Sequence, residues 1–103
     1  RLAAAQARLH FVGCLQGAPT LEDARRRAEA DPNDLAAVHA LGVRELALGQ
    51  VESALERFAS VMQLDRRYGD DLGRQSLLHA FALLEGRDDL VHQYRRRIAT
   101  LMH

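Results

Sequence analysis

The sequence has no tryptophan, no lysine and a single cysteine in 103 residues. One cysteine, Cys14, excludes an internal disulfide and a dithiol redox centre, because both need a second thiol. The 14 basic residues are all arginines, and 14 acidic residues balance them, so no net charge attracts the chain to nucleic acid. No apolar run approaches the roughly 18 residues of a membrane-spanning helix, and no secretory signal is visible. We therefore expect neither a membrane nor a nucleic-acid partner.

What is present is an amphipathic helical pattern. Hydrophobic residues make up 48% of the chain and charged residues 27%, as in a globular domain with a core. Apolar spacings of three and four predict six helices. They cover residues 2–16, 21–30, 35–48, 51–64, 72–84 and 89–102. The candidate N-caps are Thr20 for the second helix, Asn33 or Asp34 for the third, and Asp70 or Asp71 for the fifth.

Residues 31–68 organise the rest of the chain. They open with a Pro32-centred turn, which ends one helix and starts the next. Gly42 lies in the middle of a helix, where glycine costs about 1 kcal/mol against alanine, so we expect close helix packing there, opposite Ala54. The order and spacing of small and apolar residues resemble a tetratricopeptide repeat. These residues are Leu41, Gly42, Gly49, Ala54, Phe58 and Val61. Glu45 and Arg66 depart from the pattern, which usually has an aromatic residue and a proline there.

The last third of the chain is a degenerate copy of the middle. Gly49 corresponds to Gly86 and Val61 to Ile98. In both pairs the two positions are further apart in the sequence than the usual repeat length of about 34 residues. The difference predicts a longer turn before the fifth helix. We therefore expect an all-α fold with a single domain, a short right-handed solenoid of three antiparallel helical hairpins. The hairpins should cover residues 1–31, 32–68 and 69–103.

The concave side of such a solenoid is lined by the first helix of each hairpin, and it is the predicted partner-binding groove. Its residues would be Ala36, His39, Ala40, Val43, Ala47, Ser76, Leu77, Ala80 and Leu84. Since no lysine, arginine or asparagine is among them, the groove is not suited to binding a terminal carboxylate. It suits an aliphatic or helical segment of a partner protein. The alternative is that another domain of the same protein fills it.

No pattern in the sequence indicates catalysis or a cofactor. The serines of the middle and last thirds lie within helices and not at a nucleophile elbow. The histidines are His10, His39, His79, His92 and His103. No two of them are four residues apart, and we identify no cysteine or glutamate at metal-ligand spacing from them on the same turn, so we expect no metal site. The thiol of Cys14, on an apolar helix, is expected to be buried and inert. We expect a protein that is not an enzyme and has no cofactor.

Two runs of three arginines, at residues 25–27 and 95–97, invite comparison with nucleic-acid-binding segments. Acidic residues flank both runs, and no aromatic side chains interleave with the arginines to stack on bases. The runs are therefore interpreted as solvated helix faces.

The whole chain resembles the C-terminal tetratricopeptide part of YbbN-type thioredoxins, also called chaperedoxins. The resemblance is carried by the cap at residues 20–22, the turn at 31–34 with its helices, and the ending from Gly86 through Tyr94 to Leu101. It implies a bacterial, cytoplasmic co-chaperone in which a thioredoxin domain precedes the repeats. Its implied partners are unfolded client proteins and the chaperonin or the Hsp70 system. The alternative is a generic tetratricopeptide scaffold in an unrelated assembly or secretion protein.

The first predicted helix is apolar on more than one side. The chain begins with an arginine, and we expect it to be a fragment of a longer protein. An upstream repeat would then cover Leu2, Leu9 or Phe11. We expect the isolated chain to form a homodimer through this helix, because bare apolar patches tend to find partners.

Overall fold

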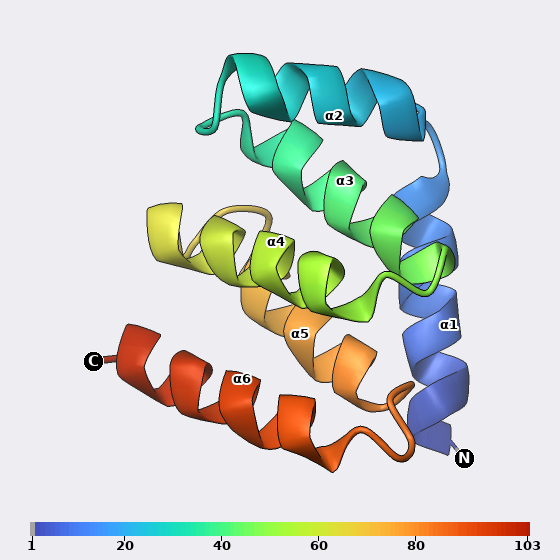
Figure 1. The fold of residues 1–103 in the computed structure, drawn as a ribbon, viewed down its shortest axis with the longest axis vertical. Coiled ribbons are helices and arrows are strands. Elements are labelled where there is room, and N and C mark those ends of the chain that lie inside the picture. The colour runs from blue at the N-terminus through green and yellow to red at the C-terminus, as the bar shows by residue number, and fades with distance from the viewer. Residues whose placement is uncertain (1) are drawn as a thin grey trace.

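The computed structural model describes residues 2–103, and all of its regular elements are helices (Figure 1). The helices are α1 (Leu2–Leu15), α2 (Leu21–Ala30), α3 (Leu35–Ala47), α4 (Val51–Leu64), α5 (Leu72–Phe81) and α6 (Asp88–Leu101). The predicted all-α class is confirmed. Within this part of the chain, no helix has both the length and the apolar character needed to cross a membrane.

Side-chain caps start two of the helices as predicted. The hydroxyl of Thr20 accepts a hydrogen bond from the backbone N–H of Asp23, at 3.2 Å, and starts α2. The carboxylate of Asp34 accepts one from the backbone N–H of Ala37, also at 3.2 Å, and starts α3. Each cap satisfies a backbone donor that the first turn of a helix leaves without a partner.

The turn before α5 differs from the prediction in one detail. Asp71 occupies the N-cap position, but its carboxylate accepts from Arg74 Nε at 2.6 Å and caps no backbone N–H. Gly69, Asp70 and Asp71 all have positive φ, at 59°, 58° and 70°. Three consecutive left-handed residues form the long turn that the sequence predicted between the two repeats.

The repeat offset is visible in the helix bounds. Both ends of α6 lie 37 positions after the matching ends of α4, and α5 begins 37 positions after α3. His39 of α3 and Ser76 of α5 are separated by the same 37 positions. Gly49 and Gly86 precede the second helix of each pair with φ of 79° and 84°, a conformation that favours glycine. The predicted correspondence of the middle and last thirds is therefore confirmed.

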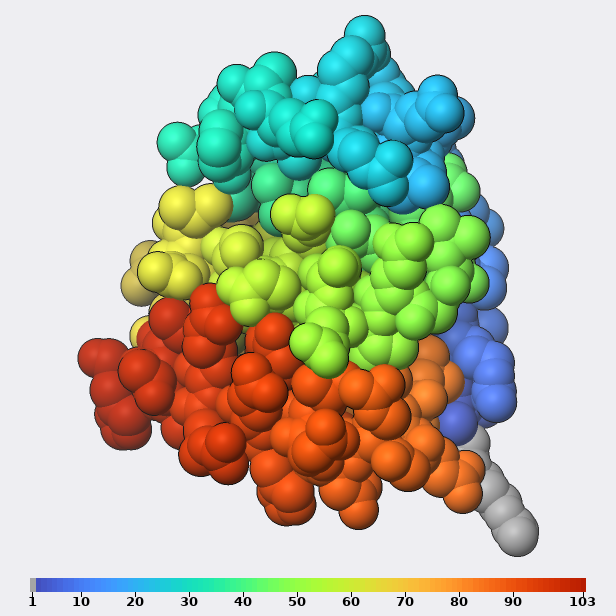
Figure 2. All heavy atoms as spheres, in the orientation of Figure 1, coloured from blue at the N-terminus to red at the C-terminus, as the bar shows by residue number. Residues whose placement is uncertain are grey.

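Five helices form a stack, and α1 crosses it. In Figure 1 the stack runs from α2 at the top to α6 at the bottom, with α3 between α2 and α4. α1 runs along one edge of this stack, visible in blue in Figure 2, and packs mainly on α5 and α3. The predicted hairpin over residues 1–31 is therefore wrong, because α2 pairs with α3 and not with α1. Arg44 of α3 holds the connection from α1 to α2 by donating to the carbonyl oxygen of Pro19 at 3.2 Å.

Close packing at Gly42 is confirmed, but with a different partner. A Cβ atom added to Gly42 would lie 2.7 Å from Phe58 Cε1 and 2.9 Å from Arg57 Cβ, which is closer than any real side chain approaches. The predicted neighbour, Ala54, is fully buried but is not among the nearest atoms. Phe58 fills the space above the glycine, and it is the largest fully buried side chain of the core.

Candidate functional site: a groove filled by the first helix

The face predicted to form the groove is packed against α1. Seven of its nine residues are buried, namely His39, Ala40, Val43, Ser76, Leu77, Ala80 and Leu84, while Ala36 and Ala47 are exposed. The ring of Phe11 on α1 joins the same core cluster as Val43 and Leu77. A partner that reached these residues would have to displace α1. Binding in the groove therefore stays a prediction, with this added condition.

The inner face of α1 packs as tightly as the core itself. Ala7 has no exposed surface, and Phe11 is 7% exposed. The rings of Phe11 and Phe58 stack with their centroids 5.9 Å apart. We expected Phe11 to need an upstream repeat as cover. That expectation is wrong for Phe11, because the groove of the same chain covers it.

A polar cluster lies where α1 crosses α3 and α5. The Oγ atom of Ser76 is 3.0 Å from His10 Nε2 and 2.7 Å from His39 Nε2. His39 and Ser76 occupy equivalent positions of the two repeats, so each repeat contributes one polar group and α1 contributes the third. Burial lowers the pKa of His39 to about 4, with a smaller effect from His10. Burial, and then the neighbouring His79, also lower the pKa of His10.

Cys14 belongs to the same cluster. Its Sγ atom lies 3.7 Å from His10 Nε2, and burial raises the pKa of the thiol. The thiol is half-buried, whereas we expected a buried one. We expected no cysteine at ligand spacing from a histidine, and this is wrong for Cys14 and His10, which are four residues apart and so share a helix face. That spacing was the available signal for the cluster.

The outer face of α1 carries an exposed apolar stripe. Leu2, Leu9 and Val12 are 73%, 72% and 55% exposed, and Ala5 lies between them on the same face. Successive members of this outer stripe are three or four residues apart, as at a helix–helix seam. No acidic residue lies in the first turn of α1 and no basic residue in its last turn. The stripe is therefore open to an apolar partner.

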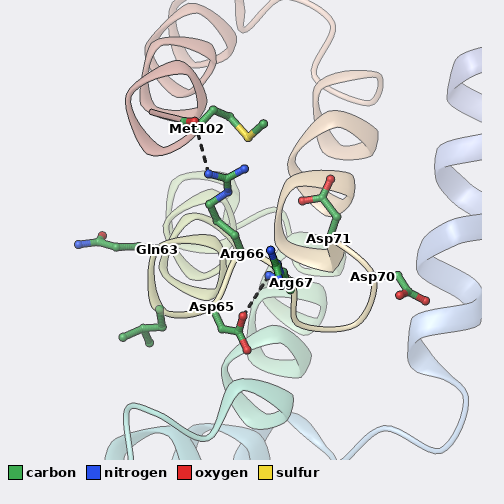
Figure 3. Close-up of a pocket in the computed structure, with 8 residues that line it drawn as sticks. Gln63, Asp65, Arg66, Arg67, Asp70, Asp71 and Met102 are labelled. Atoms are coloured by element: carbon green, nitrogen blue, oxygen red, sulfur yellow. Dashed lines mark hydrogen bonds between the residues drawn. The ribbon is translucent and has the colours of Figure 1, made fainter.

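A depression lies between the C-terminal ends of α4 and α6 and the turn before α5 (Figure 3). It has a volume of about 830 Å³ and is lined by Gln63, Leu64, Asp65, Arg66, Arg67, Asp70, Asp71 and Met102. Arg66 reaches across it and donates to the carbonyl oxygen of Met102 at 3.4 Å. The three aspartates and two arginines that line the depression mix both signs of charge, so it does not select anions over cations or cations over anions.

The arginine runs support the fold. Arg27 donates to both carboxylate oxygens of Asp34, at 3.2 and 3.3 Å, and so ties α2 to the start of α3. Arg95 lies over the ring of Phe81 with its guanidinium carbon 5.2 Å from the centroid. Arg97 pairs with Glu56 across α4 and α6. These contacts agree with helix faces that serve packing and solvation.

Helix pairs stacked around a concave groove define the helical-repeat class of proteins. The family model described as tetratricopeptide repeat matches residues 15–103, and the chain belongs to that family. Tetratricopeptide domains act as protein–protein interaction modules. The match begins at the last residue of α1 and spans α2 to α6. Neither the curated proteins nor the solved structures contain a match.

Proposed function

We propose that the chain is the interaction module of a thioredoxin-linked co-chaperone that binds apolar segments of unfolded client proteins. The tetratricopeptide family and the resemblance of the whole chain to YbbN-type thioredoxins support this role. The observation that carries it is the outer stripe of α1, whose Leu2 and Leu9 are both more than 70% exposed. Unfolded chains expose the apolar side chains that such a stripe can cover.

The outer stripe is a better client site than the predicted groove. The groove residues Val43 and Leu77 are only 2% and 0% exposed, because α1 already covers them. Substituting either by glutamate would disturb the core and could not separate binding from folding. The stripe, in contrast, can be changed without touching the core. The partners implied by the resemblance, the chaperonin and the Hsp70 system, belong to the same proposal.

The experiment measures how the protein suppresses aggregation of a chemically unfolded model client, followed by light scattering. Leu9→Glu and Val12→Glu should abolish suppression, because each places a charge within the outer stripe. Leu64→Glu is the matched control, since Leu64 is 50% exposed at the end of α4, on the side away from α1 (Figure 1). Its suppression should equal that of the wild type.

The alternative is a scaffold domain of an unrelated assembly protein, which would bind one folded partner and no unfolded clients. If the wild type fails to suppress aggregation, the co-chaperone role is rejected and the scaffold role is favoured. Equal activity of Leu9→Glu and the wild type would keep the role but move the client site away from α1. Co-purification with chaperonin or Hsp70 then tests the chaperone link separately.

A further inference from the structure

Three side chains of types that bind transition metals meet where α1 crosses the groove. His10 and Cys14 lie one turn apart on α1, and His39 comes from α3. One ligand atom of each lies within 4.8 Å of the other two. The distance from Cys14 Sγ to His10 Nε2 is 3.7 Å. A tetrahedral zinc centre, with Zn–N of about 2.0 Å and Zn–S of about 2.3 Å, has a nitrogen–sulfur edge of roughly 3.5 Å.

The two imidazole rings direct the same nitrogen toward one place. Both Nε2 atoms contact Ser76 Oγ, at 3.0 Å for His10 and 2.7 Å for His39. The ring of His10 stacks on that of His79 at a centroid distance of 4.3 Å, and the ring of His39 packs on Phe58 at 5.3 Å. Packing therefore orients both rings in advance, as a preorganised ligand set requires.

We propose that His10, Cys14 and His39 bind one zinc ion, with the hydroxyl of Ser76 or a water molecule in the fourth position. Two imidazoles and a thiolate form a borderline-soft donor set, which suits tetrahedral Zn²⁺ and does not suit Mg²⁺ or Ca²⁺. On binding, the Cys14 thiol releases its proton to solvent, and the sulfur and both nitrogens each donate an electron pair to the ion. The ion then ties α1 to α3 across the groove.

The proposal departs from the expectation of no metal site. That expectation held that no histidine has a cysteine or glutamate at metal-ligand spacing, which is wrong for Cys14, since it follows His10 by one helical turn. A single pair at this spacing is a weak signal in any helix. The third ligand, His39, comes from a different helix, and only the crossing of α1 over the groove brings it to the pair.

A hydrogen-bonded cluster without metal is the competing arrangement. The Ser76 hydroxyl can donate to one ring nitrogen and accept from the N–H of the other ring. Among residues 2–103, no buried polar side-chain atom lacks a hydrogen-bond partner. The two arrangements differ in what they need from Cys14: its sulfur is a ligand in the first and only a weak hydrogen-bond partner of His10 in the second.

The test titrates the metal-free, reduced full chain with Zn²⁺ and, separately, with Co²⁺. We expect one ion per chain, a higher melting temperature with Zn²⁺, and with Co²⁺ a sulfur-to-cobalt charge-transfer band. Cys14→Ser should remove that band, and both Cys14→Ser and His39→Gln should weaken Zn²⁺ binding by at least about tenfold. His92→Gln and His103→Gln are matched controls, since both histidines are exposed and lie outside the cluster. They should bind like the wild type.

Circular dichroism of the metal-free variants shows whether each one folds. If Cys14→Ser does not fold, the Co²⁺ spectrum of the wild type decides alone, and absence of the charge-transfer band overturns the site. Equal Zn²⁺ affinity of the wild type, Cys14→Ser and His39→Gln also overturns it, in favour of the hydrogen-bonded cluster. Loss of binding in His92→Gln overturns it as well, because the ion would then lie on exposed histidines.

Discussion

Two glycines in helices, Gly73 and Gly13, face opposite surroundings. A Cβ atom at Gly73 would lie 2.8 Å from the backbone nitrogen of Met62 and 3.0 Å from the carbonyl oxygen of Phe58. These are backbone atoms, so α4 and α5 would have to separate. At Gly13, nothing lies within 4 Å of an added Cβ.

We therefore expect Gly73→Ala to lower the free energy of unfolding by about 1–3 kcal/mol. Gly13→Ala should raise it by up to about 1 kcal/mol, because alanine restricts the unfolded chain and favours helix. Urea denaturation of both variants measures the difference. A Gly73→Ala variant that is as stable as the wild type would contradict the close approach of α4 and α5.

A second residue-scale prediction concerns Glu45, which stands where the repeat pattern usually has an aromatic residue. Its side chain is only 5% exposed, and Arg57 donates to its two carboxylate oxygens at 3.1 and 3.4 Å. Arg57→Ala would leave a buried carboxylate without a partner, so we expect a loss of about 2–3 kcal/mol. Glu45→Met should cost less, because the remaining guanidinium, in a side chain that is 41% exposed, stays hydrated.

Thermal melts of the two variants and of the double variant give the coupling between these side chains. A double variant that is less stable than Arg57→Ala alone would show that the pair is not the reason for the loss.

At the scale of helices, the sequence predicted what depends on local periodicity. Backbone chemistry within a few residues determines the bounds of α2 and the caps at Thr20 and Asp34. It also determines the glycine turns at Gly49 and Gly86. The docking of α1 does not. A helix with apolar residues all round gives no direction to its own packing, so its place in the groove is decided by distant surfaces.

The candidate site shows the same limit. The positions facing the groove follow from repeat spacing, and the structure buries most of them. The contact of His10 with Ser76 joins residues 66 positions apart, and no sequence spacing could predict it. The pairing of His10 with Cys14 could have been predicted, because four residues on a helix place two side chains on one face.

A pH prediction belongs to the contact between α4 and α6. Glu56 accepts from Arg97 through both carboxylate oxygens, at 3.1 and 3.0 Å, and from the hydroxyl of Tyr94 at 3.0 Å. The Arg97 hydrogen bonds hold the pKa of Glu56 below its ordinary value of 4.5. Burial, and then Glu56 itself, raise the pKa of Tyr94 to about 12.

Around the ordinary pKa of Glu56, 4.5, the unfolded chain therefore binds more protons at this residue than the folded chain does. The free energy of unfolding rises with pH in that range. The contribution is complete above pH 4.5 and is lost as the pH falls through the lower folded-state pKa. Because the side chain of Glu56 is 48% exposed, we expect only about 0.5–1 kcal/mol. Denaturation curves from neutral pH into the acid range should show a shallower fall for Glu56→Gln than for the wild type. Glu52→Gln, in a side chain that is 74% exposed on the same helix, should follow the wild type.

For the whole molecule, the main asymmetry is that α1 has two apolar faces and the chain covers one. The inner face, with Ala7 and Phe11, is buried in the groove. The outer stripe, with Leu2, Leu9 and Val12, is bare over most of the length of the helix. The end of the stack formed by α6 is different, since this helix turns charged residues such as Asp89 and Arg96 to solvent, as a terminal helix of a solenoid does.

We therefore expect the chain to self-associate through α1. Two copies of the stripe, with members three and four residues apart, can pack against each other about a two-fold axis, so that the same face meets itself. Light scattering at rising protein concentration should show a dimer for the wild type and for Leu64→Glu, but a monomer for Leu9→Glu. An unfolded client should compete with the dimer, because both need Leu9. A wild type that stays monomeric at high concentration would mean that two outer stripes do not bind each other. A dimer that persists in Leu9→Glu would place the dimer contact on another surface.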